Sequence, residues 1–84
     1  MQILWISKNT FLSNMAERVS KKQGWKFYSV DEFIGSAYLV PDLNPDIIFS
    51  DEITDELRKI AGNIRVVKIP IPLTTDKIES LVKN

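Results

Sequence analysis

The chain has 84 residues, with neither cysteine nor histidine, and its eleven basic and eleven acidic residues give a formal net charge of zero at pH 7. Without cysteine there are no disulfides, thiolate nucleophiles or zinc–thiolate sites, and without histidine the commonest general base is missing. These exclusions favour a binding protein over an enzyme, and we expect no cofactor and no bound metal. Because nucleic-acid binding usually needs a basic excess, we also expect no nucleic-acid partner.

The length and the 44% apolar content are typical of one globular domain, which we expect to span residues 1–84. The first six residues, Met-Gln-Ile-Leu-Trp-Ile, lack the basic segment and long apolar core of a signal peptide. No apolar run is long enough to cross a bilayer. We therefore expect a cytoplasmic location and no membrane partner.

Four short apolar segments alternate with helix-like segments. The first is an unbroken Ile-Leu-Trp-Ile, as in a strand that is buried on both faces. The others are similar in length and are bounded by glycine, proline or polar residues. The expected strands are residues 3–6, 25–30, 46–50 and 64–69.

Helix signals follow each strand. Asn9 or Thr10 is expected to cap the first helix and Gly24 to end it, while Thr54 caps a later helix and Thr74 or Thr75 begins the last. The residues expected to face inward are Leu12, Met15, Ala16 and Val19, then Leu57, Ile60 and Ala61, and finally Ile78, Leu81 and Val82.

The middle of the chain is less regular. Residues 29–32, Ser-Val-Asp-Glu, have the form of a capping box and predict a short helix through Ala37. Residues 38–40 fit either a last helical turn or a brief extended segment. Because Pro41 and Pro45 bracket residues 41–44, we expect a loop there.

This alternation predicts an α/β protein, a small three-layer, flavodoxin-like (βα)4 fold with a parallel four-stranded sheet in the order 2-1-3-4. In such sheets ligands bind beyond the carboxyl ends of the strands, at the switch point between strands 1 and 3. The residues expected at that point are Ser7, Lys8, Asn9, Thr10, Asp51 and Glu52.

Residues 45–51, Pro-Asp-Ile-Ile-Phe-Ser-Asp, resemble a segment of response-regulator receiver domains whose last aspartate accepts phosphate. The resemblance gives that position to Asp51 and adds Lys68, near Pro70, to the candidate site. Receivers also carry an acidic pair after strand 1 that binds magnesium, whereas this chain has Ser7 and Lys8. The resemblance therefore implies a pseudo-receiver, a non-enzymatic protein–protein interaction and regulatory domain that acts without phosphorylation.

A second resemblance is to the B components of the sugar phosphotransferase system, which share a four-stranded α/β plan. Their phosphorylated cysteine lies in the loop after strand 1, where this chain has Ser7. No histidine is present to activate that serine, and the loop contains no glycine to wrap a phosphate. This alternative implies a phosphocarrier or an anion-binding domain that uses the loop after strand 1.

The expected second strand is rich in aromatic residues, with Trp25, Phe27 and Tyr28, and the predicted order puts it at a sheet edge. Such an edge is either covered by helices or used to pair with another chain. The sequence therefore predicts a protein partner or self-association.

Overall fold

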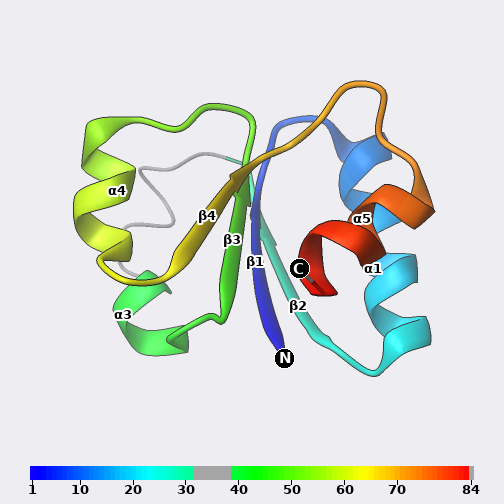
Figure 1. The fold of residues 1–84 in the computed structure, drawn as a ribbon, viewed down its shortest axis with the longest axis horizontal. Helices are drawn as coiled ribbons and strands as arrows, with labels where there is room; N and C mark the ends of the chain where they lie inside the picture. Colours follow the sequence, from blue (N-terminus) through cyan, green and yellow to red (C-terminus); the bar gives the residue numbers. More distant parts are fainter. Residues whose placement is uncertain (32–38, 84) are drawn as a thin grey trace.

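Four parallel strands form one sheet in the order β2–β1–β3–β4, which confirms the predicted fold class and strand order. The computed structural model describes residues 1–31 and 39–83 (Figure 1). The strands are β1, Gln2–Ile6; β2, Lys26–Val30; β3, Ile47–Ser50; and β4, Arg65–Lys68. The expected bounds differ from these by one residue at several strand ends. Both central strands are almost wholly buried, whereas β2 and β4 form the two edges.

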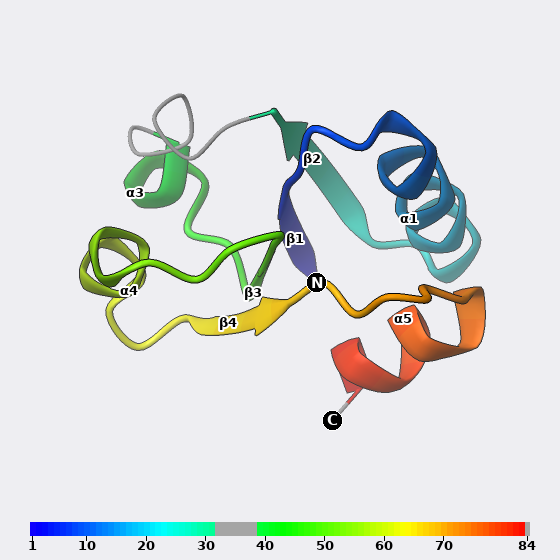
Figure 2. The same cartoon turned by 90° about the horizontal axis from the view of Figure 1, so that it is seen from above.

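Helices cover both faces of the sheet (Figure 2). They are α1, Thr10–Gln23; α3, Leu39–Leu43; α4, Asp55–Ala61; and α5, Thr75–Lys83. Helices α1 and α5 pack on one face, and α3 and α4 on the other. In the described part of the chain, no helix is both long and apolar enough to cross a membrane.

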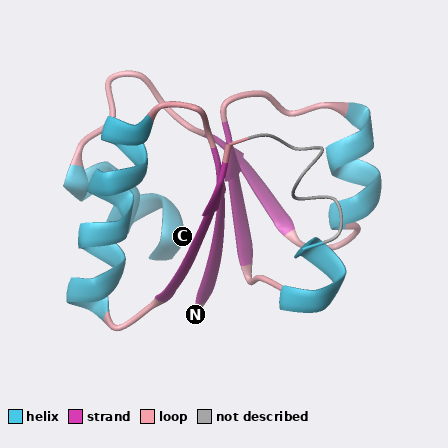
Figure 3. Cartoon of the chain, turned by 180° about the vertical axis from the view of Figure 1, so that it is seen from behind, coloured by secondary structure: helices cyan, strands magenta, loops and turns pink. Residues whose placement is uncertain are grey.

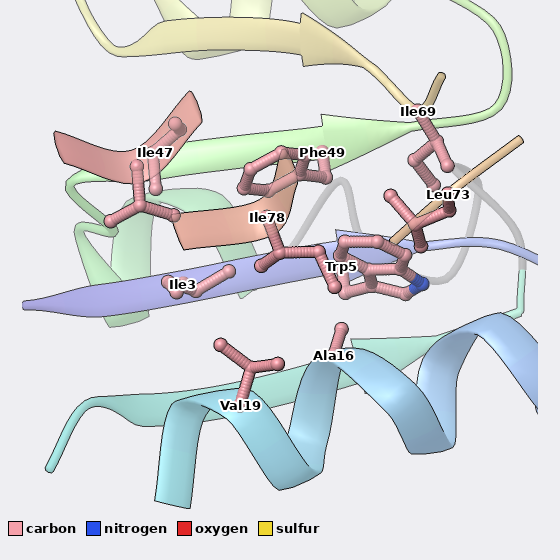
Figure 4. Packing of buried hydrophobic residues seen from close by; sticks show 10 residues of the cluster. Ile3, Trp5, Ala16, Val19, Ile47, Phe49, Ile69, Leu73 and Ile78 are labelled. Carbon is pink, nitrogen blue, oxygen red and sulfur yellow. The ribbon is translucent and has the colours of Figure 1, made fainter. Parts of the chain in front are cut away.

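The larger core cluster lies between the sheet and helices α1 and α5 (Figure 4). Trp5 of β1 and Phe49 of β3 form its centre, with ring centroids 5.1 Å apart, and Phe27 of β2 lies 6.1 Å from Trp5 on the other side. Ala16 and Val19 of α1 close this layer. Because parallel strands send alternate side chains to opposite faces, every second residue of β1 and β3 enters this cluster.

The intervening strand residues form the second cluster, on the face of α3 and α4. Leu4 and Ile6 of β1 and Ile48 of β3 pack there against Leu57 and Ala61 of α4. The unbroken apolar pattern of the central strands thus reflects burial on both faces, as expected.

Polar side chains fix the starts of three helices. Asn9 accepts a hydrogen bond from the backbone N–H of Leu12 at 3.2 Å, so it is the cap of α1. Thr54 accepts one from Leu57 at 3.2 Å, and Thr74 accepts one from Lys77, also at 3.2 Å. The predicted caps of α1, α4 and α5 are therefore confirmed.

The loop predicted for residues 41–44 is wrong, because residues up to Leu43 belong to the short helix α3. Pro41 is tolerated there since the first-turn N–H groups of a helix have no intrahelical partner. Asn44 ends the helix at a φ of 47°, and its N–H donates to the Val40 carbonyl at 3.0 Å. The helix predicted through Ala37 lies outside the described residues.

Ile60 was expected to face inward and instead is 37% exposed. The inner stripe of α4 consists of Leu57 and Ala61, which are four residues apart and both buried. With only seven residues, α4 buries a narrow stripe, and Ile60 lies at its margin.

Candidate functional site

An open pocket of about 310 Å³ lies at the carboxyl ends of β1 and β3, where the sequence placed the switch point. It is on the side of the sheet that α3 and α4 cover, because Ile6 belongs to the cluster on that face. The described residues that line it are Ile6, Lys8, Asp31, Ser50, Asp51, Glu52 and Thr54.

Backbone hydrogen bonds hold the three strand ends beneath the pocket together. The Ser7 N–H donates to the Val30 carbonyl at 3.0 Å, and the Asp51 N–H donates to the Ile6 carbonyl at 3.2 Å. The Ser50 hydroxyl donates to the Glu52 carbonyl at 2.7 Å, which fixes the turn after β3. The residues that follow these strands are thereby brought to one edge of the sheet.

The loop after β1 uses its polar side chains for its own structure. Ser7 is 4% exposed, and its hydroxyl oxygen accepts a hydrogen bond from the Asn9 N–H at 3.0 Å. Asn9 in turn caps α1, and Thr10 is the first residue of that helix. Ser7 and Asn9 therefore shape the turn and Thr10 begins α1, while Lys8 is the residue of this loop that lines the pocket.

This geometry bears on the phosphocarrier alternative. A nucleophilic serine must present its hydroxyl to the reacting group and needs a base to take its proton. The Ser7 hydroxyl is buried against its own turn. At the start of α1 the Asn9 side chain already binds the Leu12 N–H, one of the groups that would otherwise meet an anion. The contacts of Ser7 and Asn9 therefore do not favour phosphotransfer.

The pocket wall carries three carboxylates, those of Asp31, Asp51 and Glu52, against the single ammonium group of Lys8. All four residues are exposed. Within residues 1–31 and 39–83, no three acidic side chains converge closely enough to hold a metal ion. The described lining of the pocket is thus acidic overall, with the Lys8 ammonium group on its wall.

The predicted site residues divide into three groups. Lys8, Asp51 and Glu52 line the pocket together. Ser7 and Asn9 form the turn after β1, and Thr10 is the first residue of α1. Lys68 pairs with Ser50 in the sheet register and is exposed, but it does not line the pocket.

Sequence reasoning missed Asp31 and Thr54. Asp31 directly follows β2, so its position was available from the strand prediction, because the carboxyl ends of all parallel strands meet at one edge. Thr54 was assigned only a capping role, and its place on the pocket wall follows from the short path between β3 and α4.

No protein-family model matches this sequence, and no curated protein does. Solved structures do resemble the fold. The receiver domain of the hybrid histidine kinase CckA is similar, with a TM-score of 0.79 and 15% identity over 99% of this chain and 96% of that one. An orphan response regulator of H. pylori has a TM-score of 0.68 and 17% identity over 99% of this chain and 94% of its own. At these identities the likeness establishes a receiver-like fold.

Proposed function

We propose that residues 1–84 form a single receiver-like regulatory domain that binds a protein partner without being phosphorylated. The observation that carries the proposal is the placement of Lys8 on the wall of the same pocket as Asp51. In a receiver this end of the sheet holds a magnesium ion beside the phosphoacceptor aspartate. The charge on the pocket wall therefore determines whether Asp51 can be phosphorylated in the same way.

The residues present do not fit that metal. Magnesium binds oxygen ligands in near-octahedral geometry, usually with one or two carboxylates. After β1 this chain offers the buried Ser7 hydroxyl, which already accepts the Asn9 N–H, and the Lys8 ammonium group. A cation on the wall repels a second cation in the same pocket. Asp51 is then left without the divalent charge that phosphoryl transfer requires.

Exposed apolar side chains near the same edge support a role in protein contact. Phe11, in the first turn of α1, is 67% exposed, and Ile71, between β4 and α5, is 88% exposed. Aromatic side chains such as Phe11 are enriched in the cores of protein–protein interfaces, so we assign these two side chains to the partner-binding surface.

The test is a pair of ¹⁵N–¹H NMR spectra of the whole chain, recorded with and without magnesium and beryllofluoride. We expect the amide signals of Ser7, Lys8 and Asp51 to stay in place. Incubation with acetyl phosphate and magnesium, followed by intact-mass measurement, is expected to leave the mass unchanged. Shifts centred on Asp51, or a mass gain that Asp51→Asn abolishes, would overturn the proposal.

A further inference from the structure

Helices α1 and α5 cover the same face of the sheet, opposite α3 and α4 (Figure 3). An open groove of about 390 Å³ lies between α1 and α5 at the surface. The residues that line it are Arg18, Val19 and Lys22 of α1 and Thr75, Asp76 and Glu79 of α5. No described residue lines both this groove and the pocket at the carboxyl ends of β1 and β3, so the two are separate places on the molecule.

The two walls of the groove carry opposite charges. Arg18 and Lys22 make the α1 wall basic, whereas Asp76 and Glu79 make the α5 wall acidic. Glu79 is half-buried, and the other three side chains are exposed. Within residues 1–31 and 39–83, no ion pair joins one wall to the other. The four charges can therefore pair with charges on a partner.

This arrangement of charge is complementary to a second copy of itself. A two-fold axis along the groove places α1 of each copy over α5 of the other. Each basic wall then faces an acidic wall, and the same contact forms twice, as in an isologous interface. A two-fold axis across the groove would instead place α1 on α1 and bring like charges together. Because like charges at an interface oppose binding, the charges favour the first orientation.

An exposed aromatic side chain lies on the same side of α1 as the basic wall. Phe11 is 67% exposed and precedes Arg18 by seven residues and Lys22 by eleven, which is close to two and three helical turns. A second copy that covers the basic wall therefore lies along the stripe of α1 that includes Phe11. Aromatic side chains are enriched in the cores of protein–protein interfaces, so Phe11 would add apolar contact to the charge pairs.

We propose that the chain forms a homodimer through this groove, with α1 of each copy on α5 of the other. The inference rests on the proposed function in one respect, because it identifies a second copy as a partner of the surface to which Phe11 belongs. It does not involve Asp51. Phosphorylation of Asp51 would overturn the proposed function and leave the dimer in place, whereas a chain that stays monomeric would overturn the dimer alone.

Two measurements on the unmodified chain test the dimer. In sedimentation equilibrium at low salt, we expect the average mass to rise with concentration and to level off at twice the mass of the chain, because an isologous interface closes. In a ¹⁵N–¹H NMR dilution series, we expect the amide signals of Arg18, Lys22 and Asp76 to shift and those of α4, on the opposite face of the sheet, to stay in place. A monomer at every concentration, or shifts that leave α1 and α5 unaffected, would overturn the proposal.

Charge reversal tests the orientation. Arg18→Glu with Lys22→Glu makes both walls acidic, and we expect the dissociation constant of the dimer to rise about tenfold or more. Addition of Asp76→Lys and Glu79→Lys makes the walls opposite again and returns the net charge to that of the unmodified chain. We expect this quadruple variant to dimerise. A quadruple variant that is folded by far-UV circular dichroism and stays monomeric would refute the proposed orientation.

The matched control is Arg58→Glu with Lys59→Glu, which makes the same change of net charge on α4. These side chains are exposed and lie on the helix that covers the opposite face of the sheet. We expect the dissociation constant of the dimer to change by less than about threefold, because the substituted charges lie outside the groove. Equal weakening by the α1 and α4 variants would show that net charge alone controls association, which would overturn the proposal.

Discussion

Trp5 carries a buried polar atom whose cost can be measured. Its side chain is fully buried in the larger core cluster, and its Nε1 has no hydrogen-bond partner among the described residues. A buried donor that loses its water without gaining an acceptor costs about 1–3 kcal/mol. Trp5→Phe removes that N–H together with two ring carbons and leaves an aromatic ring beside Phe49.

The two contributions of Trp5→Phe oppose each other. Burial of the two carbons contributes about 1.6 kcal/mol at about 0.8 kcal/mol per carbon, and that stabilisation is lost. Removal of the unpaired N–H stabilises the folded state by about 1–3 kcal/mol. We therefore expect the free energy of unfolding to change by less than about 1.5 kcal/mol. Phe49→Leu is the matched control, because it removes three carbons from the same stack with no polar group, and about 2.4 kcal/mol or more should be lost.

Urea unfolding followed by far-UV circular dichroism measures both variants. The midpoint and slope give the free energy of unfolding in each case, provided that the slope stays constant between variants. Trp5→Phe should lie closer to the unmodified protein than Phe49→Leu does. If Trp5→Phe destabilises the fold as much as Phe49→Leu, the Nε1 group carries no penalty and the reasoning fails.

Three further substitutions probe the local structure by the same unfolding measurement. Asn9→Ala should cost about 1 kcal/mol through loss of the α1 cap, whereas Thr10→Ala, one residue later, should cost less than half of that. Gly24→Ala should cost about 1–2 kcal/mol, because φ is 77° there while the space around the new methyl group is open. Ile60→Gln should change stability by less than about 0.5 kcal/mol, in contrast to about 2–5 kcal/mol for the buried Leu57→Ala.

The sheet was predictable because its signals are local and redundant. Each strand contains a short apolar run, the segments that form α1, α4 and α5 have helical spacing, and a capping side chain or glycine marks most of their ends, as Asn9 and Gly24 do for α1. Strand-like and helix-like segments alternate along the chain. Because parallel strands need crossover helices, this alternation is compatible with few topologies. The strand order 2-1-3-4 followed from that restriction.

The errors fell where one signal competes with another. Pro41 and Pro45 predict a loop between them, but in the first turn of α3 Pro41 interrupts no hydrogen bond. Ile60 satisfied the helical spacing, but the width of the buried stripe of α4 depends on how the helix lies on the sheet. That orientation is a tertiary property that periodicity does not contain.

The site was partly predictable for a related reason. Topology named the edge of the sheet and therefore Lys8 and Asp51, which do line one pocket. It did not separate residues that face the pocket from those that build the turn, such as Ser7. The direction of a side chain within a loop depends on hydrogen bonds such as the one that the Asn9 N–H donates to the Ser7 hydroxyl oxygen. The residue types allow this hydrogen bond but do not require it.

Lys8 allows a direct test of why the pocket would not take a metal. If its cation is what excludes magnesium, Lys8→Asp should create a site with Asp51 and Glu52, because all three positions line one pocket. A ligand that binds only the folded state stabilises it by RT ln(1 + [L]/Kd), so magnesium at ten times its Kd would add about 1.4 kcal/mol and raise the melting temperature by several degrees.

The control for this experiment is Lys68→Asp, which makes the same charge change on the neighbouring strand outside the pocket wall. We expect differential scanning calorimetry to show a magnesium-dependent rise in melting temperature for Lys8→Asp and none for the unmodified chain or Lys68→Asp. A rise in all three proteins would mean that the native pocket already binds magnesium. Lack of a rise in Lys8→Asp would mean that the geometry of the carboxylates, and not the lysine charge, excludes the ion.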